Sequence, residues 1–211
     1  MRIYSKKKAP KIEIFSKSMA DIQRDCREWA KEIANDFKPD LIIFIAKSGY
    51  LFAEPMSQYF HCSMADIVAK RPASAEKDKL RRIIRLIPEK IILRTISSTL
   101  MYKFNEKKQE RFVETSIRYN CEKKKKHDRI LIVDDSVDTG WTLLQVRKEV
   151  ENSFPAAIVR TAGYSVIEYS KNRISVDYYR YKNTVILTAT SRRSAEYDKF
   201  ISAYEKWLLK C

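Results

Sequence analysis

The sequence predicts an α/β fold built on a single doubly wound, mainly parallel sheet. Two short runs of purely apolar residues, Leu41–Ile45 and Ile130–Val133, have the length and composition of buried parallel strands. Each run is followed by a glycine-containing turn and then by apolar residues at helical spacing. Strands that alternate with helices in this way predict ligand-binding loops at the carboxyl ends of the strands.

In the first part of the chain, one helix is expected before the Leu41–Ile45 run, and a second helix and a strand are expected after it. A helix is expected over about residues 17–37, because its apolar side chains recur on one face. These are Met19, Ile22, Cys26, Trp29, Ile33 and Phe37. A short helix is expected over Leu51–Phe60 and a strand over Met64–Ala69. Arg71-Pro72 is expected to end regular structure, since proline has no backbone N–H to donate.

Residues 71–118 are interpreted as a basic helical insertion or lid. Apolar residues recur over 80–87 and stop at Pro88, which predicts two helices within 78–104. Residues 77–111 hold eleven Lys or Arg against four Asp or Glu, a local net charge of +7. Such a segment could close over a polyanionic ligand, and a permanently docked insertion is the alternative.

The remaining elements follow the second apolar run. A helix is expected after residue 142, with its apolar face at Leu143, Val146 and Val150. Three further strands are expected over Ala157–Thr161, Val176–Tyr179 and Val185–Thr188. A C-terminal helix closes the chain, with an apolar face made of Tyr197, Phe200, Ile201, Tyr204, Trp207 and Leu208. We interpret residues 1–211 as a single domain.

Composition favours a cytoplasmic protein. The four cysteines have no paired spacing, which indicates neither a disulfide framework nor a zinc site. The first residues lack the apolar core of a signal peptide, and no run approaches the roughly 18 apolar residues that a membrane span needs. The chain has only two histidines, so catalysis built on histidine is not expected.

The segment Asp134–Thr142 is the strongest candidate for a ligand site. It is expected to be a loop between a buried strand and a helix, where amides of the first helical turn carry the positive end of the helix dipole. These amides, with the hydroxyls of Thr139 and Thr142, suit a phosphate. Asp134 and Asp135 suit sugar hydroxyls or a divalent cation held through water, so a phosphorylated sugar is the expected ligand.

A second turn, Ala46–Gly49, follows the first apolar run. The whole chain has three glycines, and two of them lie in these two turns, at Gly49 and Gly140. Glycine in such turns permits positive φ or a close approach of the backbone to a ligand. With Lys47 beside it, the second turn suits a pyrophosphate.

Together the two turns resemble those of a known enzyme family. Val133–Thr142 resembles the signature with which type I phosphoribosyltransferases bind 5-phosphoribosyl-1-pyrophosphate (PRPP), and Ala46–Gly49 resembles their pyrophosphate loop. The resemblance implies a transferase that moves a phosphoribosyl group from PRPP to an acceptor with Mg²⁺ as cofactor and releases pyrophosphate. It also implies a non-proline cis peptide bond in the Ala46–Gly49 turn.

The resemblance further implies a role for each residue of the two turns. Asp134 and Asp135 would contact the ribose and hold Mg²⁺, directly or through water. Binding of the 5-phosphate would fall to Asp138, Thr139, Gly140, Trp141 and Thr142, and binding of the pyrophosphate to Lys47, Ser48 and Gly49. Such a site works by electrostatic positioning around an oxocarbenium-like transition state and needs no covalent nucleophile.

The acceptor is less closely defined by the sequence. Asp138 occupies the position of the aspartate that exchanges a proton with the acceptor ring in purine-using members, which favours a purine-like acceptor. Purine-using members also bind the base with a cationic residue, and the only match for it in this sequence is Arg160. The 186–196 stretch lacks the aromatic pattern with which the family usually stacks on the base. Ser48 also replaces a glycine that is common in the pyrophosphate loop, so a non-standard acceptor stays open.

Two other functions are kept as alternatives. The net charge of +15 allows a PRPP-sensing regulator that binds RNA or DNA. The atypical 186–196 stretch allows a phosphoribosyltransferase of a surface-polysaccharide or secondary-metabolite pathway. The expected partners are PRPP and a small-molecule acceptor, with nucleic acid and a homodimer left open and no membrane expected.

Overall fold

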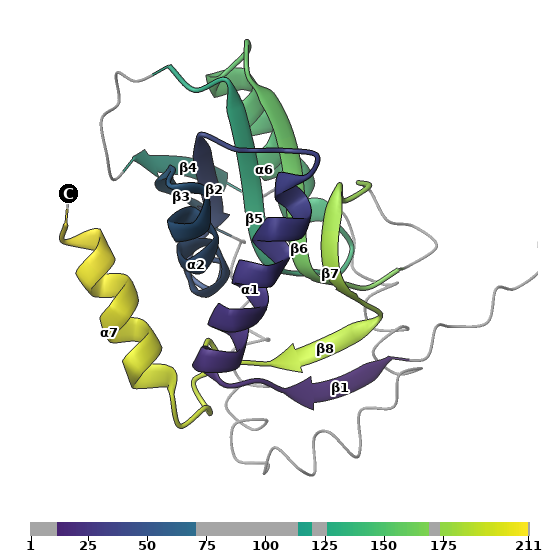
Figure 1. Cartoon of the computed structure of the whole chain (residues 1–211), viewed down its shortest axis with the longest axis vertical. Helices are drawn as coiled ribbons and strands as arrows, with labels where there is room; N and C mark the ends of the chain where they lie inside the picture. The colour runs from purple at the N-terminus through teal and green to yellow at the C-terminus, as the bar shows by residue number, and fades with distance from the viewer. Residues whose placement is uncertain (1–11, 71–113, 120–125, 169–173, 211) are drawn as a thin grey trace, which may run out of the picture.

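The structure, a computed structural model, describes residues 12–70, 114–119, 126–168 and 174–210 (Figure 1). Among these residues, six strands form the central sheet, and a separate small sheet pairs two strands in parallel. Across the central sheet the order is β4 (Glu114–Tyr119), β3 (Ser63–Lys70), β2 (Leu41–Ile45), β5 (Arg129–Val137), β6 (Ile158–Val166) and β7 (Tyr178–Lys182). The small sheet contains β1 (Glu13–Ser16) and β8 (Thr184–Leu187).

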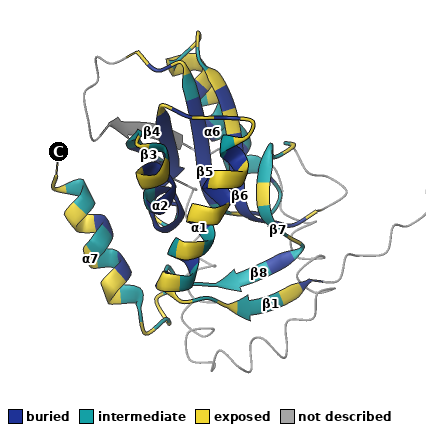
Figure 2. Cartoon of the chain, viewed as in Figure 1, coloured by how far each residue is buried: buried dark blue, intermediate teal, exposed yellow. Residues whose placement is uncertain are grey.

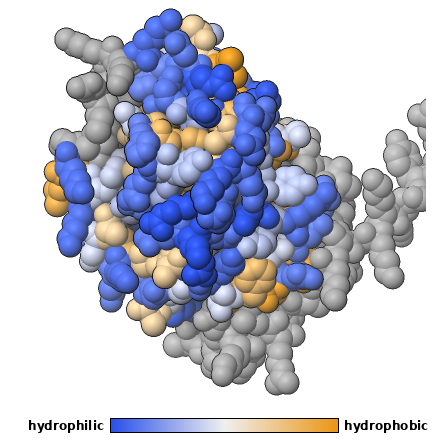
Figure 3. All heavy atoms as spheres, in the orientation of Figure 1, coloured by the Kyte–Doolittle hydropathy of each residue, from blue (hydrophilic) through white to orange (hydrophobic). Residues whose placement is uncertain are grey.

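Helices cover both faces of the central sheet. Buried side chains of α1 (Met19–Ala34), α2 (Tyr50–Phe60) and α7 (Tyr197–Leu208) join one core with alternate residues of β2 and β5. Those of α6 (Trp141–Ser153) join a second core with the other alternate residues of the same strands. Figure 2 shows β2 and β5 buried along most of their length, while α1 keeps an exposed outer face that is hydrophilic in Figure 3. The predicted doubly wound sheet is confirmed.

The central strands are parallel, as their uniformly apolar sequences predict. β2 pairs in parallel with β3 and β5, and β5 pairs in parallel with β6. All five residues of β2 are buried, which explains why none is polar. Within the described ranges, no helix has the length and apolar character that would let it cross a membrane.

The predicted long loop from Asp134 to Thr142 is wrong in its first half. β5 continues through Val137, because its pairing with β6 extends to Val137 opposite Val166. Val137 is buried, with 3% of its surface exposed, so it contributes to the core and not to a loop. Only Asp138–Gly140 connects β5 to α6.

The far end of the predicted insertion also differs from expectation. β4 runs antiparallel to β3 and forms one edge of the sheet, so the end of the 71–118 segment is a strand and not part of a helix. The helices predicted within 78–104 lie outside the described residues. The small sheet of β1 and β8 was not predicted, because β1 is short and its partner lies about 170 residues further along the chain.

Candidate functional site

The two turns singled out in the sequence lie at the same edge of the sheet. Ala46–Gly49 follows β2, and Asp138–Gly140 follows β5. β2 and β5 are parallel neighbours, with Phe44 in register with Val133, so their carboxyl ends point in the same direction. Each turn leads directly into a helix, α2 and α6 respectively. The two turns therefore lie at the carboxyl ends of neighbouring parallel strands, where ligand-binding loops were predicted.

The Ala46–Gly49 turn is anchored on the sheet at both of its ends. The Ala46 amide donates to the Ile67 carbonyl at 2.9 Å, and the Gly49 amide donates to the Ile45 carbonyl at 3.0 Å. Within the described part of the chain, the amides of Lys47 and Ser48 donate to no backbone carbonyl. The Gly49 amide is thus already hydrogen-bonded to β2. The amides of Lys47 and Ser48 are therefore better placed than that of Gly49 to bind a pyrophosphate.

The backbone geometry of this turn agrees with the family resemblance. The Ala46–Lys47 peptide bond is cis, as the resemblance implies. Gly49 has a φ of −57°, which any residue can adopt, so the need for glycine has another cause. A Cβ atom at Gly49 would lie 2.7 Å from the Ile45 carbonyl oxygen and 3.1 Å from the Val133 carbonyl oxygen. Glycine is required here by the close approach of its backbone to two strands.

The Asp138–Gly140 turn presents the N-terminus of α6. Gly140 is the N-cap residue and has a φ of 77°, in the left-handed region that favours glycine. Its carbonyl accepts from the Leu144 amide at 2.9 Å, and no side chain caps the helix at this residue. A helix N-terminus of this kind can bind an anion such as phosphate through its amides and dipole. Thr139, Trp141 and Thr142 are half-buried around it.

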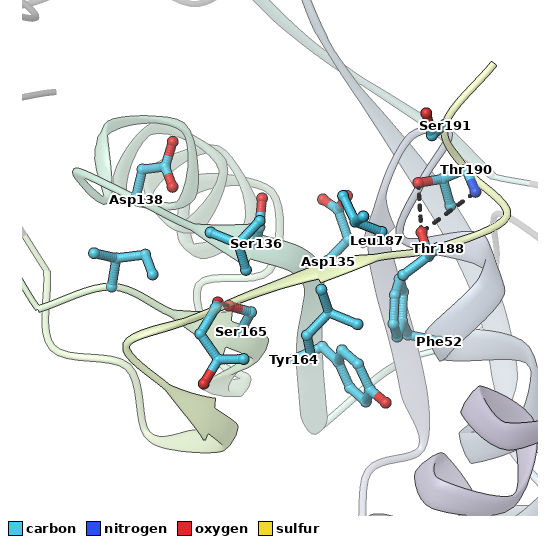
Figure 4. A pocket seen from close by; sticks show the side chains of 14 residues that line it. Phe52, Asp135, Ser136, Asp138, Tyr164, Ser165, Leu187, Thr188, Thr190 and Ser191 are labelled. Atoms are coloured by element: carbon cyan, nitrogen blue, oxygen red, sulfur yellow. Dashed lines mark hydrogen bonds between the residues drawn. The ribbon is translucent and has the colours of Figure 1, made fainter. Parts of the chain in front are cut away.

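Asp134 and Asp135 have different environments because neighbouring residues of a strand point to opposite faces of the sheet. The Asp134 side chain is almost fully buried, at 6% exposure, and its Oδ1 accepts from the Asp135 amide at 3.0 Å. The Asp135 side chain lies on the face of α1 and α2 and lines a pocket (Figure 4). Loss of hydration raises the pKa of Asp135, and the nearby charge of Asp138 acts in the same direction.

The pocket has a volume of about 300 Å³ and lies beyond the carboxyl ends of β5 and β6. Figure 4 shows Asp135 and Ser136 on β5, Asp138 beside the start of α6, and the rings of Phe52 and Tyr164 nearby. Its lining residues come from α2, from β5 and β6 with the residues that follow them, and from β8 with its following segment. They are Phe52, Asp135, Ser136, Asp138, Tyr164, Ser165, Ile167, Thr184, Val185, Ile186, Leu187, Thr188, Thr190 and Ser191.

The rim of the pocket comes largely from the stretch that lacks the family's aromatic pattern. Thr188 and Thr190 are joined by a hydrogen bond of 2.8 Å between their hydroxyls. The Ser165 hydroxyl donates to the Thr184 carbonyl, which ties β6 to β8. These rim residues were not predicted as site residues. The sequence feature that could have identified them is the short apolar run Val185–Leu187. Polar residues follow this run, as they follow the apolar runs of β2 and β5.

Arg160 lies away from this pocket. It is near the amino end of β6, in register with Leu131, and is not among the lining residues. Its Nη1 donates to Asp177 Oδ1 at 2.9 Å, and Asp177 Oδ2 accepts from the Thr161 amide and hydroxyl at 2.9 and 2.7 Å. Burial acts to raise the pKa of Asp177, but these hydrogen bonds lower it overall. The arrangement supports a structural role for Arg160 and gives no support to acceptor binding.

The acidic residues of the site fit Mg²⁺ bound together with a substrate. In the parts of the chain that the structure describes, no three acidic, His or Cys side chains converge on a point that could hold a metal. Mg²⁺ is commonly held by one or two carboxylates with waters and substrate phosphates, and not by a cage of protein ligands. Asp135, with the buried Asp134 behind it, matches that requirement.

Sequence comparison places these features in a known family. A model described as the phosphoribosyl transferase domain matches residues 17–165, which includes both turns. The chain belongs to this family of phosphoribosyltransferases. A search among curated proteins finds no match.

Several solved structures share the fold, and two of those described here are phosphoribosyltransferases. The Helicobacter pylori xanthine-guanine-hypoxanthine phosphoribosyltransferase is 14% identical, with a TM-score of 0.58 over 90% of this chain and 99% of that chain. The purine phosphoribosyltransferase of Pyrococcus horikoshii is 19% identical, with a TM-score of 0.55 over 86% and 96%. A Neisseria gonorrhoeae protein with bound ppGpp is 15% identical, with a TM-score of 0.55 over 93% and 98%. At these identities the likeness establishes the fold alone.

The family match divides the pocket of this phosphoribosyltransferase into two parts. The matched residues end at Ser165, so they contain Asp135, Asp138 and the floor of the pocket. The rim from Thr184 to Ser191 lies beyond the match. The side of the pocket formed by the PRPP signature is therefore the part that family membership describes, and the rim has to be understood from its own chemistry.

Proposed function

We propose that the protein transfers a phosphoribosyl group from PRPP to a purine-like acceptor in a Mg²⁺-dependent reaction. The observation that carries this proposal is that Asp135 and Asp138 line one pocket at the sheet edge where both phosphate-suited turns lie. A sugar phosphate at the α6 N-terminus would bring its ribose toward Asp135. An acceptor in the pocket would then lie beside both the ribose and Asp138.

Each part of PRPP has a candidate partner. The 5-phosphate would bind at Thr139–Thr142, where the helix dipole and hydroxyls favour an anion. The ribose hydroxyls would donate to Asp135, and Asp134 would orient Asp135 through the 3.0 Å hydrogen bond to its amide. Lys47 and Ser48 would face the pyrophosphate. When bound, Mg²⁺ would offset the negative charge of the pyrophosphate beside Asp135.

The transfer step needs a proton acceptor near the incoming ring. A ring nitrogen forms a bond to C1 of the ribose while the bond from C1 to the pyrophosphate oxygen breaks, and the pyrophosphate leaves with the bonding electrons. The N–H proton of the acceptor passes to the Asp138 carboxylate. Positioning and electrostatic stabilisation of the oxocarbenium-like transition state supply the catalysis.

A thermal-shift experiment tests the proposal directly. PRPP with Mg²⁺ should raise the unfolding temperature by mass action, and Asp135→Asn should remove most of that rise. Asp128→Asn is the matched control, because Asp128 lies just before the opposite end of β5 and its side chain is 63% exposed. An unchanged PRPP shift in Asp135→Asn would contradict the assignment.

Pyrophosphate release separates the proposal from its alternatives. A PRPP-sensing regulator would show the thermal shift without releasing pyrophosphate in the presence of any base. A transferase with a non-standard acceptor would show the shift and would release pyrophosphate only with an acceptor other than the common purines. The proposed purine-like acceptor requires release with at least one purine above the rate of PRPP hydrolysis.

A further inference from the structure

Residues 188–195 connect β8 to α7 through a series of turns and form part of the pocket wall (Figure 4). Thr188, Thr190 and Ser191 line the pocket, and each is partly exposed. The Ser191 amide donates to the Thr188 carbonyl at 3.1 Å, and the hydroxyls of Thr188 and Thr190 are 2.8 Å apart, so these bonds stay within the segment. Ala189 is the buried member of the segment. The position of the other residues therefore depends on how the two ends of the segment are held.

The first end of this segment is held by Lys17. The Lys17 amide donates to the carbonyl of Leu187, the last residue of β8, at 3.0 Å. The Lys17 side chain is 19% exposed, and its ammonium group donates to Asp25 Oδ2 at 2.6 Å and to the Tyr181 hydroxyl. Asp25 belongs to α1 and Tyr181 to β7, so Lys17 joins the end of β8 to a helix and to the central sheet.

The second end is held by Glu196. Glu196 Oε2 accepts a hydrogen bond of 2.9 Å from the amide of Met19, the first residue of α1. Glu196 occupies the N-cap position of α7, but its side chain makes no capping hydrogen bond there and reaches α1 instead. A carboxylate is favoured beside the first turn of a helix, because the amides of that turn carry the positive end of the helix dipole. Figure 1 shows the start of α1 beside the segment that leads into α7.

The short stretch that leads into α1 therefore holds both ends of the 188–195 segment. Lys17 bonds to the residue just before the segment, and Met19 bonds to the residue just after it. Neither Lys17 nor Glu196 is among the described residues that line the pocket. Their effect on a ligand would therefore pass through the segment that they hold and not through direct contact.

We propose that Glu196 is a positioning residue for acceptor binding, which holds the 188–195 segment in place as a wall of the acceptor pocket. The inference rests on the proposed function and adds to it a residue outside the pocket. Without the bond to the Met19 amide, the segment would occupy its observed position for only part of the time. The affinity for the acceptor would then fall with the fraction of molecules in which the wall is in place. The two turns proposed to hold PRPP follow β2 and β5, so the affinity for PRPP should not change.

Ligands with and without a base test this inference without requiring turnover. Ribose 5-phosphate and PRPP lack a base, whereas inosine, guanosine, xanthosine and adenosine monophosphates carry one on the same ribose phosphate. In Glu196→Ala, calorimetry should show the affinity for the tightest of these nucleotides falling about 10-fold, as if the wall were in place about a tenth of the time. The affinities for ribose 5-phosphate and PRPP should stay within about 2-fold, because their contacts lie elsewhere. Glu205→Ala is the matched control, since Glu205 is exposed on the same helix, α7.

Two conservative variants separate the position of the Glu196 carboxylate from its charge. Glu196→Gln keeps the length of the side chain and an oxygen that can accept from the Met19 amide, so it should restore most of the nucleotide affinity. Glu196→Asp keeps the charge but is shorter by one methylene, so it should resemble Glu196→Ala, and it replaces that variant if Glu196→Ala does not fold. Full affinity in Glu196→Asp together with a loss in Glu196→Gln would show that charge is what matters and would overturn the inference.

Hydrogen exchange of the free protein tests whether Glu196 holds the segment. Peptides that cover residues 188–196 should exchange faster in Glu196→Ala than in the unmodified protein, because local opening becomes easier. Peptides that cover β8 should be unchanged, since β1 and Lys17 still hold that strand. Unchanged exchange over residues 188–196 would contradict the role given to Glu196.

The outcomes distinguish failure of the inference from failure of the proposed function. If Glu196→Ala weakens PRPP as much as the nucleotide, or weakens neither, the inference is overturned while the phosphoribosyl transfer stands. If no nucleotide of the panel binds the unmodified protein more tightly than ribose 5-phosphate, the inference is also overturned, because the wall then contributes nothing to binding. If PRPP, ribose 5-phosphate and all four nucleotides fail to bind, the proposed function fails and the inference falls with it.

Discussion

At the scale of single residues, the site depends on which face of a strand each carboxylate occupies. Asp134 and Asp135 are neighbours in sequence, yet Asp134 is buried within the sheet and Asp135 lines the pocket. The sequence identified both as acidic site residues, but it could not assign them different roles, because that requires knowing that β5 continues past them. Because β5 continues past both residues, its side chains alternate between the two faces of the sheet, and this alternation gives Asp134 and Asp135 different environments.

Asp138 is expected to matter for turnover more than for PRPP binding. Asp138 lines the pocket and lies just beyond β5, so under the proposed function Asp138→Asn should remove the proton acceptor with little change to the sugar-phosphate contacts. General acid–base catalysis of this kind is worth about 100-fold or more, so we expect turnover to fall by that factor while the PRPP thermal shift is kept. Pyrophosphate release with the best acceptor measures this. Equal turnover in the two proteins would mean that Asp138 only shapes the turn.

Asp25 is expected to stabilise the fold in a pH-dependent way. Burial acts to raise its pKa, but hydrogen bonds from Lys17, Tyr164, Tyr181 and Arg180 outweigh this and lower the pKa to about 2 from 3.8. A lowered carboxyl pKa stabilises the folded state above the unfolded pKa, and the contribution is lost as pH falls from about 4 to about 2. The shift corresponds to about 2 kcal/mol at pH 7, since one pKa unit is about 1.4 kcal/mol.

Urea unfolding of Asp25→Asn tests this contribution. The free energy of unfolding at pH 7 should fall by at least about 2 kcal/mol, and the gap to the unmodified protein should narrow at pH 3 and below. Glu28→Gln is the control, because Glu28 lies on the same helix with its side chain 53% exposed and pairs only with Lys31 at 2.9 Å among the described contacts. A gap that does not depend on pH would show that ionisation of Asp25 is not what stabilises the network.

At the scale of elements, the predictions succeeded where a segment is uniformly apolar or strongly periodic. β2 was predicted at its observed bounds and α2 within one residue, since Leu41–Ile45 and the residues after Gly49 leave little choice. The end of β5 was missed because acidic residues are typical of loops, and only pairing with β6 reveals the strand. β1 was missed because its four residues gain their conformation from a distant partner, β8.

The turn after β2 provides a prediction at this scale. Gly49→Ala should lower the free energy of unfolding by about 1–3 kcal/mol, as overpacking does, because the new Cβ would meet backbone oxygens of two central strands that cannot turn aside. It should also weaken PRPP binding by displacing Lys47 and Ser48. Gly163→Ala is the comparison, because its Cβ would meet methyl groups of Val137 and Val166 at 2.9 Å, which are side-chain atoms and not the backbone of a central strand. A larger loss in Gly163→Ala would contradict the explanation for Gly49.

At the scale of the whole molecule, the positive charge has to be reconciled with an acidic pocket. Residues 77–111 carry a local net charge of +7 and lie outside the described residues, so their role is inferred from the sequence. PRPP carries several negative charges, and Lys47 is the basic residue of the two described turns. Further cations are needed to balance a pyrophosphate, and the basic segment is the part of the sequence richest in them.

This charge balance predicts competition between PRPP and nucleic acid. A protein with a net charge of +15 should bind single-stranded RNA through counterion release, with an affinity that falls steeply with salt. If the basic segment also serves PRPP, saturating PRPP with Mg²⁺ should weaken RNA binding several-fold at low salt, which fluorescence anisotropy of a labelled RNA can measure. Inorganic phosphate at the same ionic strength is the control for screening. Unchanged RNA affinity would show that the basic segment does not take part in PRPP binding. RNA binding that tightens when PRPP is added would favour a PRPP-sensing regulator over the transferase proposed here.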